Sequence, residues 1–314
     1  SALRAVFEAA KFLKPWAVAI FDSDLASISM KWIQNIIDPI KNDYDLVCPD
    51  YNRYKLDATI TNTMAYNLTR ALYGVSIRQP IGGDFGFSFP LIRHLLNKED
   101  EWESDVARFG VDIWLTTTAI VDGFNICQAK LGTKVHGQKD PAADLGPMFR
   151  QVVGTIFRLM EIHENFWKEV RGSREVPTIG DYMDEKPVPF DIDQERLIEY
   201  FRVGFKNFGT VWQQIVETED WNVIQQLADK PARKSFYVPI ETWVRIVYRY
   251  ANAFHTSLHQ RMKLLDTMIP LYYGRVASLV NELDGCNTDN ADELFIAQAK
   301  TFEDMKGYLL DNWH

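Results

Sequence analysis

The sequence predicts an α/β sheet domain over residues 1–150, followed by an all-helical region over residues 151–314. Short apolar runs with the length of strands alternate with helical patterns in the first half alone. After about residue 150, apolar residues recur at spacings of three and four, which is the period of helices packed on one face. The stretch 171–191 is rich in proline and charge and is the best linker candidate.

The first half predicts a helix at its start and strands separated by helices. In chain order we expect a helix over 3–13, a strand over 16–21 with the length of a buried strand, a helix near 29–40, a strand over 44–49, a helix over 57–74, a glycine-rich loop over 79–87, a helix near 88–97, a further apolar block over 111–121 and an edge strand over 124–129. An α/β domain normally begins with a βαβ unit, and here no strand precedes the first helix. We therefore expect the chain to be an N-terminally truncated fragment.

The second half predicts helices with few interruptions. We expect them over 147–169, 192–205, 208–217, 219–228, 240–262, 264–284 and 291–312. The nine tryptophans of the chain are most simply explained as core residues, many of them in this helical region.

Composition narrows the classes of function. The chain has 314 residues and a net charge of −9 without a basic stripe, so we expect no nucleic-acid partner. An anionic substrate would need a metal ion or a local group of bases. The three cysteines are scattered, which argues for reduced thiols and against a disulfide framework or zinc site. With no apolar stretch of membrane-spanning length and no signal peptide visible, we expect a cytoplasmic protein without a membrane partner.

Asp22-Ser23-Asp24 follows the apolar run 17–21. Side chains at i and i+2 of an extended chain project to the same side, so both carboxylates can face one divalent cation. Hard oxygen ligands suit Mg²⁺ or Mn²⁺, which are commonly shared with substrate phosphates. Paired carboxylates at the end of a strand indicate a nucleotide-sugar transferase, and an ordinary turn with a helix cap is the alternative.

Two further places carry residues suited to a site. Gly82-Gly83-Asp84-Phe85-Gly86 allows the backbone to approach a ligand closely, or forms an ordinary turn. Asp112 lies in an otherwise apolar stretch, where an unpaired carboxylate is costly. It either caps the helix that follows or orients a hydroxyl or faces positive charge that develops at a sugar carbon.

A histidine and an arginine complete the candidates. His136 follows the presumed last strand of the α/β part, and its imidazole can complete a carboxylate-rich metal site or be an ordinary core or surface residue. Arg53 lies just beyond a strand end, with Asp57 and Thr61 on the next segment. A guanidinium and a hydroxyl suit an acceptor carboxylate or phosphate, and surface or helix-capping roles are the alternative.

Together these residues resemble the retaining glycosyltransferases of the GT-A fold that make mannosylglycerate and glucosyl-3-phosphoglycerate, and the mannosylglycerate synthases most of all. The matching elements are Phe-Asp-Ser-Asp (21–24), Tyr-x-Arg-x-x-x-Asp-Ala-x-Ile-Thr (51–61), Gln-Pro-Ile-Gly-Gly-Asp (79–84), Gly-Val-Asp (110–112) and Lys-Val-His (134–136). They occur in the family's order at similar separations, and the helical half is similar as well. The resemblance implies a Rossmann-like GT-A sheet that lacks its first strands here.

The resemblance also implies a role for each matching residue. Asp22 and Asp24 match the pair that holds the metal ion and the donor diphosphate, and Asp24 is the stronger ligand candidate. His136 matches the metal-binding histidine, which completes a site for Mn²⁺ or Mg²⁺. Lys139 stands where the mannosylglycerate family tends to have tyrosine, and we expect it to contact the donor diphosphate.

The acceptor side of the site follows from the same comparison. Arg53 and Thr61 match positions that hold the carboxylate and hydroxyls of glycerate. Gly82 and Gly83 match a loop whose backbone contacts acceptor and sugar. Asp84, which we also expect on the acceptor side, stands where glutamate is expected, so its reach is shorter.

The sequence therefore predicts a metal-dependent hexosyltransferase that uses a nucleoside-diphosphate sugar and a small hydroxy acid such as glycerate, with retention at the anomeric carbon. Asp112 matches the carboxylate near the reacting centre, where we favour a positioning role over a nucleophilic one. One alternative is a 3-phosphoglycerate or other acceptor, although phosphate calls for more bases near Arg53 and Lys55 is the single one close in sequence. Others are a nucleotidyltransferase and a non-catalytic scaffold that forms homo-oligomers through the helical region.

Overall fold

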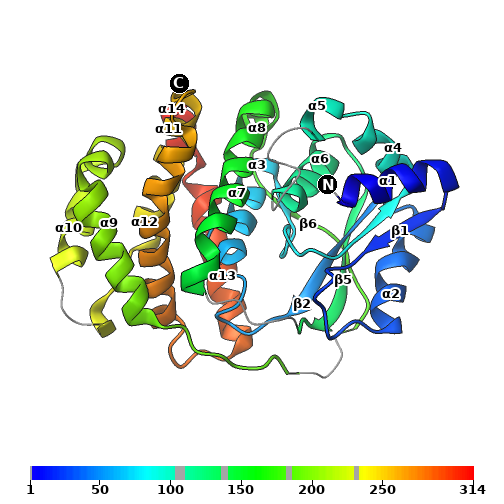
Figure 1. Cartoon of the computed structure of the whole chain (residues 1–314), viewed down its shortest axis with the longest axis horizontal. Coiled ribbons are helices and arrows are strands. Elements are labelled where there is room, and N and C mark those ends of the chain that lie inside the picture. The colour runs from blue at the N-terminus through cyan, green and yellow to red at the C-terminus, as the bar shows by residue number, and fades with distance from the viewer. Residues whose placement is uncertain (1, 103–109, 136–140, 182–185, 230–232) are drawn as a thin grey trace.

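The computed structural model describes residues 2–102, 110–135, 141–181, 186–229 and 233–314. Over these residues, a mixed α/β part with a central sheet is followed by a helical region, as the sequence predicts. Figure 1 shows the sheet with its covering helices on the right and most of the helical region on the left.

The central sheet is mixed, with parallel and antiparallel pairs. Its strands in spatial order are β1 (Ala17–Ile20), β4 (Phe85–Ser88), β2 (Leu46–Asn52), β5 (Ile126–Thr133) and β7 (Thr178–Ile179). β4 runs antiparallel to β1 and β2, whereas β2, β5 and β7 are parallel to one another. The carboxyl ends of β1, β2, β5 and β7 therefore lie at one edge of the sheet, together with the start of β4.

Three sequence predictions about these strands are wrong. β1 lies at the edge of the sheet and is half-buried, not buried. β5 is an inner strand between β2 and β7 instead of an edge strand. The end of the predicted loop 79–87 belongs to β4. Its glycine is explained by packing, because a Cβ on Gly86 would come within 2.5 Å of the Ile36 carbonyl oxygen. Glycine there lets the helix α2 (Met30–Ile37) pack directly on the strand.

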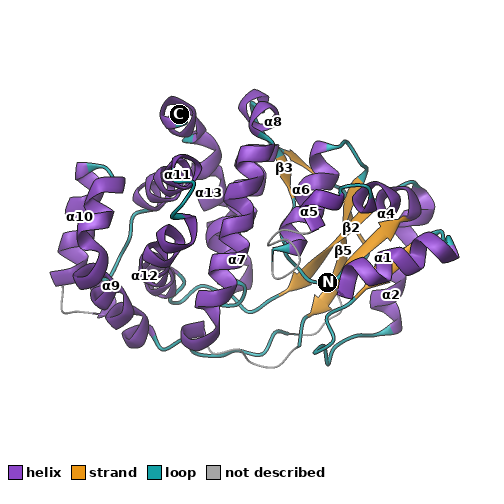
Figure 2. Ribbon diagram, turned by 45° about the horizontal axis from the view of Figure 1, so that its top comes forward, coloured by secondary structure: helices purple, strands orange, loops and turns teal. Residues whose placement is uncertain are grey.

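Helices cover both faces of the sheet (Figure 2). α1 (Ala2–Leu13) and α4 (Phe89–Leu96) lie on one face, where Phe7 packs edge-on against Phe87 with ring centroids 5.0 Å apart. On the other face Trp32 of α2 packs against Tyr51, with centroids 5.4 Å apart. Neighbouring residues of β2 belong to the two opposite cores, as the alternation of a strand requires.

The helix predicted over 57–74 begins at residue 59. It passes through a wide π-type turn, Thr61–Ala65, continues as α3 (Tyr66–Tyr73) and ends at Gly74 in the left-handed region. The apolar block over 111–121 is the helix α6 (Val111–Val121), and a short helix α5 (Glu99–Trp102) follows α4. The indole of Trp243, from the helical region, donates to the Thr63 carbonyl oxygen over 3.0 Å. The helical region therefore packs directly on this helix.

The helical region contains the predicted helices with small changes of bounds. The helices are α7 (Pro141–Ile162), α8 (Glu164–Glu169), α9 (Gln194–Ile215), α10 (Thr218–Asp229), α11 (Ile240–Thr256), α12 (Arg261–Glu282), α13 (Thr288–Asp304) and α14 (Lys306–Asn312). The two helices predicted over 192–205 and 208–217 form the single helix α9. A Cβ on Gly204 would come within 2.2 Å of Pro270, so glycine lets α9 cross α12 closely.

The predicted linker 171–191 returns to the α/β part. Within it, β6 (Arg174–Glu175) pairs with β3 (Val75–Ser76), and β7 pairs with β5. α7 spans residue 150, and a domain boundary at that position stays a prediction. Among the described residues, no helix combines the length and apolar character needed to cross a membrane.

Candidate functional site

The loops at the carboxyl ends of the parallel strands meet at one edge of the sheet. Asp22 lies two residues after β1, Arg53 directly after β2 and Lys134 directly after β5. Because β4 runs the opposite way, the loop 82–84 that precedes it reaches the same edge. This is the edge at which open α/β sheets bind ligands.

Lys134 joins two carboxylates that are distant in sequence. Its ammonium lies 2.7 Å from Asp22 Oδ2 and 3.1 Å from Asp84 Oδ2, and it donates to the Gly82 carbonyl oxygen over 2.8 Å. The Lys134 side chain is 4% exposed and that of Asp84 is 0% exposed, whereas Asp22 is 45% exposed. With Asp112, which lies close to them, we call these residues the carboxylate cluster: Asp22, Asp84, Asp112 and Lys134.

Asp84 fixes the geometry of this cluster. One of its oxygens accepts the main-chain N–H of Asp22 over 2.7 Å, and the other accepts the Tyr51 hydroxyl as well as Lys134. Burial raises the pKa of Asp84, and the nearby Lys134 charge opposes that rise. The predicted acceptor contact of Asp84 stays a prediction, while the bonds it makes here orient Asp22, Tyr51 and Lys134.

The glycine pair is required by close contacts. A Cβ on Gly83, whose φ is +85°, would lie 2.2 Å from Asp22 Oδ2, and one on Gly82 would lie 2.1 Å from the Pro49 ring. Glycine therefore lets the 82–83 backbone lie directly against the first carboxylate of the Asp-x-Asp motif.

Asp112 lies in the first turn of α6, whose N-cap residue is Gly110. The alternative that Asp112 is the N-cap is therefore wrong. Instead, its carboxylate accepts a hydrogen bond from the backbone of Gly83. Burial and the negative charge of Asp22 raise the pKa of Asp112 to about 7, against the opposing effect of Lys134. The carboxyl group is thus poised between its charged and neutral forms near neutral pH.

The predicted metal ligands are described in part. Asp24 lies exposed beyond β1, two residues from Asp22. His136 and Lys139 lie outside the described residues. Over the described ranges no three His, Cys, Asp or Glu side chains are grouped so that they could hold a metal ion. Asp22 and Asp24 fit a hard cation in kind, because they offer carboxylate oxygens.

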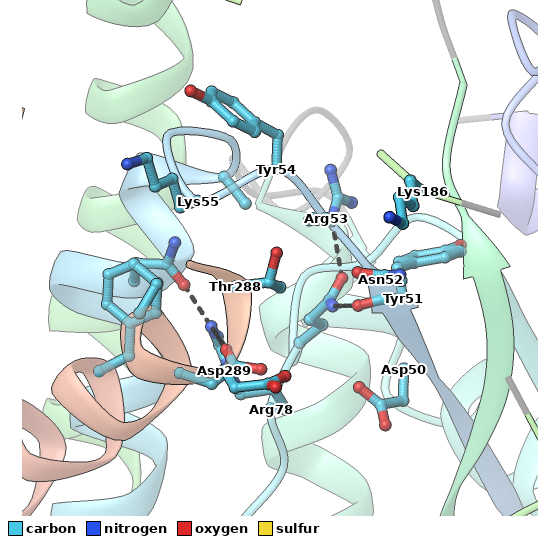
Figure 3. Close-up of a pocket in the computed structure, with 16 residues that line it drawn as sticks. Asp50, Tyr51, Asn52, Arg53, Tyr54, Lys55, Arg78, Lys186, Thr288 and Asp289 are labelled. Atoms are coloured by element: carbon cyan, nitrogen blue, oxygen red, sulfur yellow. Dashed lines mark hydrogen bonds and ion pairs between the residues drawn. The ribbon is translucent and has the colours of Figure 1, made fainter. Parts of the chain in front are cut away.

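A polar pocket of about 300 Å³ opens beside the cluster, and Figure 3 shows its lining. Arg53 donates to Gln79 over 2.8 Å and to Asp57 over 2.7 Å. The lining residues are Asp50, Tyr51, Asn52, Arg53, Tyr54, Lys55, Ala58, Asn62, Arg78, Gln79, Lys186, Thr288, Asp289, Ala291, Asp292 and Phe295. β2 extends to Asn52, so Tyr51 and Asn52 belong to the strand and Arg53 is the first residue beyond it.

Tyr51 connects the pocket to the cluster. Its ring lies beneath the Arg53 guanidinium, 5.0 Å from the ring centroid, and the Lys134 ammonium lies 5.1 Å from the same centroid. Its hydroxyl donates to Asp84. The polar pocket and the carboxylate cluster therefore share Tyr51 as a common wall.

Of the predicted acceptor residues, the structure places Arg53 in the pocket lining, and Gly82, Gly83 and Asp84 at the cluster. Thr61 is buried in the π-type turn and is not one of the lining residues. Its predicted contact with an acceptor stays a prediction.

Sequence reasoning missed several residues of this site. Lys134 belongs to the matching motif 134–136, but no role was predicted for it from the sequence. Its position after a predicted strand could have marked it as a site residue. Arg78, Lys186 and the first residues of α13 also line the pocket, and no local pattern marks them. Their approach depends on how the helical region packs against the sheet.

Comparisons with known proteins find structural likeness alone. No protein-family model matches, and no curated protein matches. Glucosyl-3-phosphoglycerate synthase from Mycobacterium tuberculosis is similar in two solved structures, one with Mn²⁺, UDP-glucose and phosphoglyceric acid and one with phosphoglyceric acid. The TM-score is 0.39 for both, with 22% and 23% identity. The matches cover 50% and 49% of this chain and 54% and 53% of those chains, so this chain spans about half the length of the structures it matches.

Proposed function

We propose that this chain carries the site of a retaining, metal-dependent glycosyltransferase of the GT-A fold. It would move a hexose from a nucleoside-diphosphate sugar to a small hydroxy acid such as glycerate. The observation that supports this most is the junction between the two parts of the site. Asp22, Gly83 and Asp112 are held together at the ligand edge of the sheet, and Tyr51 joins them to a pocket that carries Arg53.

The donor would lie over the Asp-x-Asp loop. Asp24, Asp22 and His136 would hold Mn²⁺ or Mg²⁺, and Lys139 would contact the diphosphate. The cation supplies positive charge that offsets the charge developing on the leaving diphosphate. The geometry adds that Asp22 also pairs with Lys134 over 2.7 Å. Because Asp22 already pairs with Lys134, Asp24, which is also exposed, is the stronger ligand candidate.

The acceptor would occupy the polar pocket. Arg53, held on the Tyr51 ring and by Asp57, suits a single carboxylate. Neutral groups of the lining such as Gln79 and Thr288 suit hydroxyls. A volume of about 300 Å³ accommodates a small acid.

Asp112 would act at the reacting carbon. The hydrogen bond from Gly83 and the packing of the cluster fix its orientation. In its charged form it would face the positive charge that develops at the sugar carbon. Retention would follow if the pocket holds the acceptor hydroxyl on the face of the leaving group, whose departing oxygen can take the proton. A covalent double displacement through Asp112 is the alternative mechanism.

A screen of nucleoside-diphosphate sugars against small acids, with Mn²⁺ present and products identified by NMR, tests this function. We expect an α-linked product from an α-linked donor. We also expect a fall in kcat of about 10²-fold or more for Asp112→Asn, and little change for Asp311→Asn, an exposed residue of α14. An inverted product would reject retention. Nucleotide-sugar formation without an acceptor would point to a nucleotidyltransferase, and no binding of donor would favour a scaffold.

Two further predictions accompany this proposal. We propose that the protein acts in the cytoplasm and that the helical region supports homo-oligomers. Size-exclusion chromatography with light scattering tests the second.

A further inference from the structure

The helical region supplies an acidic wall to the polar pocket. Thr288, Asp289 and Asp292 at the start of α13 line it, and Figure 3 labels the first two among the lining residues. Asp289 lies in the first turn of α13, where a carboxylate already complements the positive end of the helix. Asp289 therefore already balances the positive end of the helix dipole, which is not left to attract an anionic ligand.

Arg78, which lines the same pocket, is committed to protein partners. Its guanidinium donates to Asp292 over 2.9 and 3.3 Å and to Asn62 over 2.8 Å. It lies over the rings of Tyr66 and Phe295, 5.3 and 5.0 Å from their centroids. These contacts hold the group in place and use all three of its nitrogen atoms.

Lys55 is also engaged. Its ammonium donates to the main-chain oxygens of Leu283 and Cys286 over 2.7 and 3.0 Å, just beyond the end of α12. Its position is therefore set by its role in joining the helical region to the β2 loop. Lys55 and Arg78, two of the basic residues that line the pocket with Arg53, therefore both serve internal contacts.

The charges of the pocket are nearly balanced before any ligand enters. Four basic lining residues, Arg53, Lys55, Arg78 and Lys186, stand with three acidic ones, Asp50, Asp289 and Asp292, and Asp57, which is not a lining residue, pairs with Arg53. A phosphate adds close to two negative charges and needs several uncommitted donors. A carboxylate adds one charge and can be met by one guanidinium.

We propose that Asp292, through its ion pair with Arg78, is a specificity-determining residue that makes the pocket select a small acid charged at its carboxylate alone over the same acid bearing a phosphate. The inference rests on the proposed function, because it places the acceptor in this pocket. Asp292 is half-exposed, so its negative charge can repel a phosphate that enters the pocket. Its ion pair with Arg78 also keeps that guanidinium from binding the phosphate.

The test compares D-glycerate with 3-phosphoglycerate as acceptors for the full protein, Asp292→Asn and Glu293→Gln. Asparagine keeps an oxygen that can accept from Arg78, so the variant retains the packing of α13. Glu293→Gln removes the same charge from the adjacent exposed position, which does not line the pocket. We expect wild type and Glu293→Gln to prefer glycerate. We expect Asp292→Asn to shift the ratio of kcat/KM towards the phosphorylated acid by about tenfold, which is about 1.4 kcal/mol. The change should lie in KM.

Calorimetric binding of the two acids to the same proteins gives a readout that does not require turnover. A wild type that prefers 3-phosphoglycerate, or an Asp292→Asn ratio within twofold of wild type, would overturn the inference while leaving glycosyl transfer intact. If no acid is glycosylated, the proposed function fails, and the ratio of the two dissociation constants still decides whether Asp292 discriminates against phosphate.

Discussion

Replacing Lys134 with methionine should destabilise the protein strongly, because its ammonium is the counter-charge of a buried carboxylate. Lys134 is 4% exposed and Asp84 is 0% exposed, so the lost pair is a buried one. Removing one partner of a buried ion pair costs about 3–5 kcal/mol. The bond to Asp22 adds little, because that carboxylate is 45% exposed and water can replace the lysine. We therefore expect a loss of about 3–4 kcal/mol.

Urea unfolding followed by tryptophan fluorescence measures this loss. Asp84→Asn removes the buried charge that lysine answers, so the double variant should be less destabilised than the sum of the two single variants by about 2 kcal/mol. Lys263→Met, at an exposed position of α12, should change the free energy of unfolding by less than about 0.5 kcal/mol. A loss below about 1 kcal/mol for Lys134→Met, or additive single variants, would refute the reasoning.

The remaining predictions concern a glycine, a proposed ligand and an ion pair. Gly83→Ala should cost about 2 kcal/mol or more, because it adds a contact of 2.2 Å to the strain of a positive φ. Gly285→Ala, which has a similar φ of +74° and nothing within 4 Å of the new Cβ, should cost clearly less, and equal losses in thermal unfolding would contradict this. Asp24→Ala should abolish metal-dependent transfer while leaving the unfolding midpoint unchanged in the absence of metal, and full activity in the intact protein would reject Asp24 as the ligand. Burial raises the pKa of Glu303, but hydrogen bonds from the neighbouring hydroxyl and guanidinium outweigh this and hold it below its usual 4.5. Its folded pKa is the lower one, so its contribution is complete above about pH 4.5 and is lost as the pH falls further. Glu303→Gln should therefore cost about 1–3 kcal/mol at pH 7, and the difference from wild type should shrink below pH 4.5; a difference that does not depend on pH would contradict this.

Local pattern was sufficient for most helices and for the strands that carry apolar runs. The helix over 3–13 was predicted from its apolar periodicity, and the strand that ends before Asp22 was predicted from its unbroken apolar run. β4 was missed because its Gly86 closes the glycine-rich run 82–86, which resembles a loop, whereas glycine is needed there because a helix packs on the strand. The order of the strands in the sheet could not be predicted from local pattern either, because strand pairing depends on residues far apart in the chain.

The residues of the candidate site likewise fall into those that a motif predicts and those that depend on contacts between distant parts of the chain. Asp22, Arg53, Asp112 and the glycine pair were named from motifs, and the structure places them at one edge of the sheet. The part played by Lys134 could not be derived, because it depends on the approach of two carboxylates 112 and 50 residues away. The acidic wall of the pocket comes from α13, more than 200 residues after Arg78. Contacts of that range leave no periodic trace in a single sequence.

The pairing of β7 with β5 has a consequence for synthesis of the chain. Until Thr178 emerges from the ribosome, Gln128 and Ala129 on the outer edge of β5 lack their strand partner, and an open edge can pair with another chain. Roughly 45 residues separate the two strands, so at usual rates of translation the edge stays open for on the order of a few seconds. We expect nascent chains that end before Thr178 to sediment as aggregates more readily than chains that extend past Ile179. The two-residue strand β7 would then contribute less to the stability of the sheet than to covering part of the β5 edge late in synthesis.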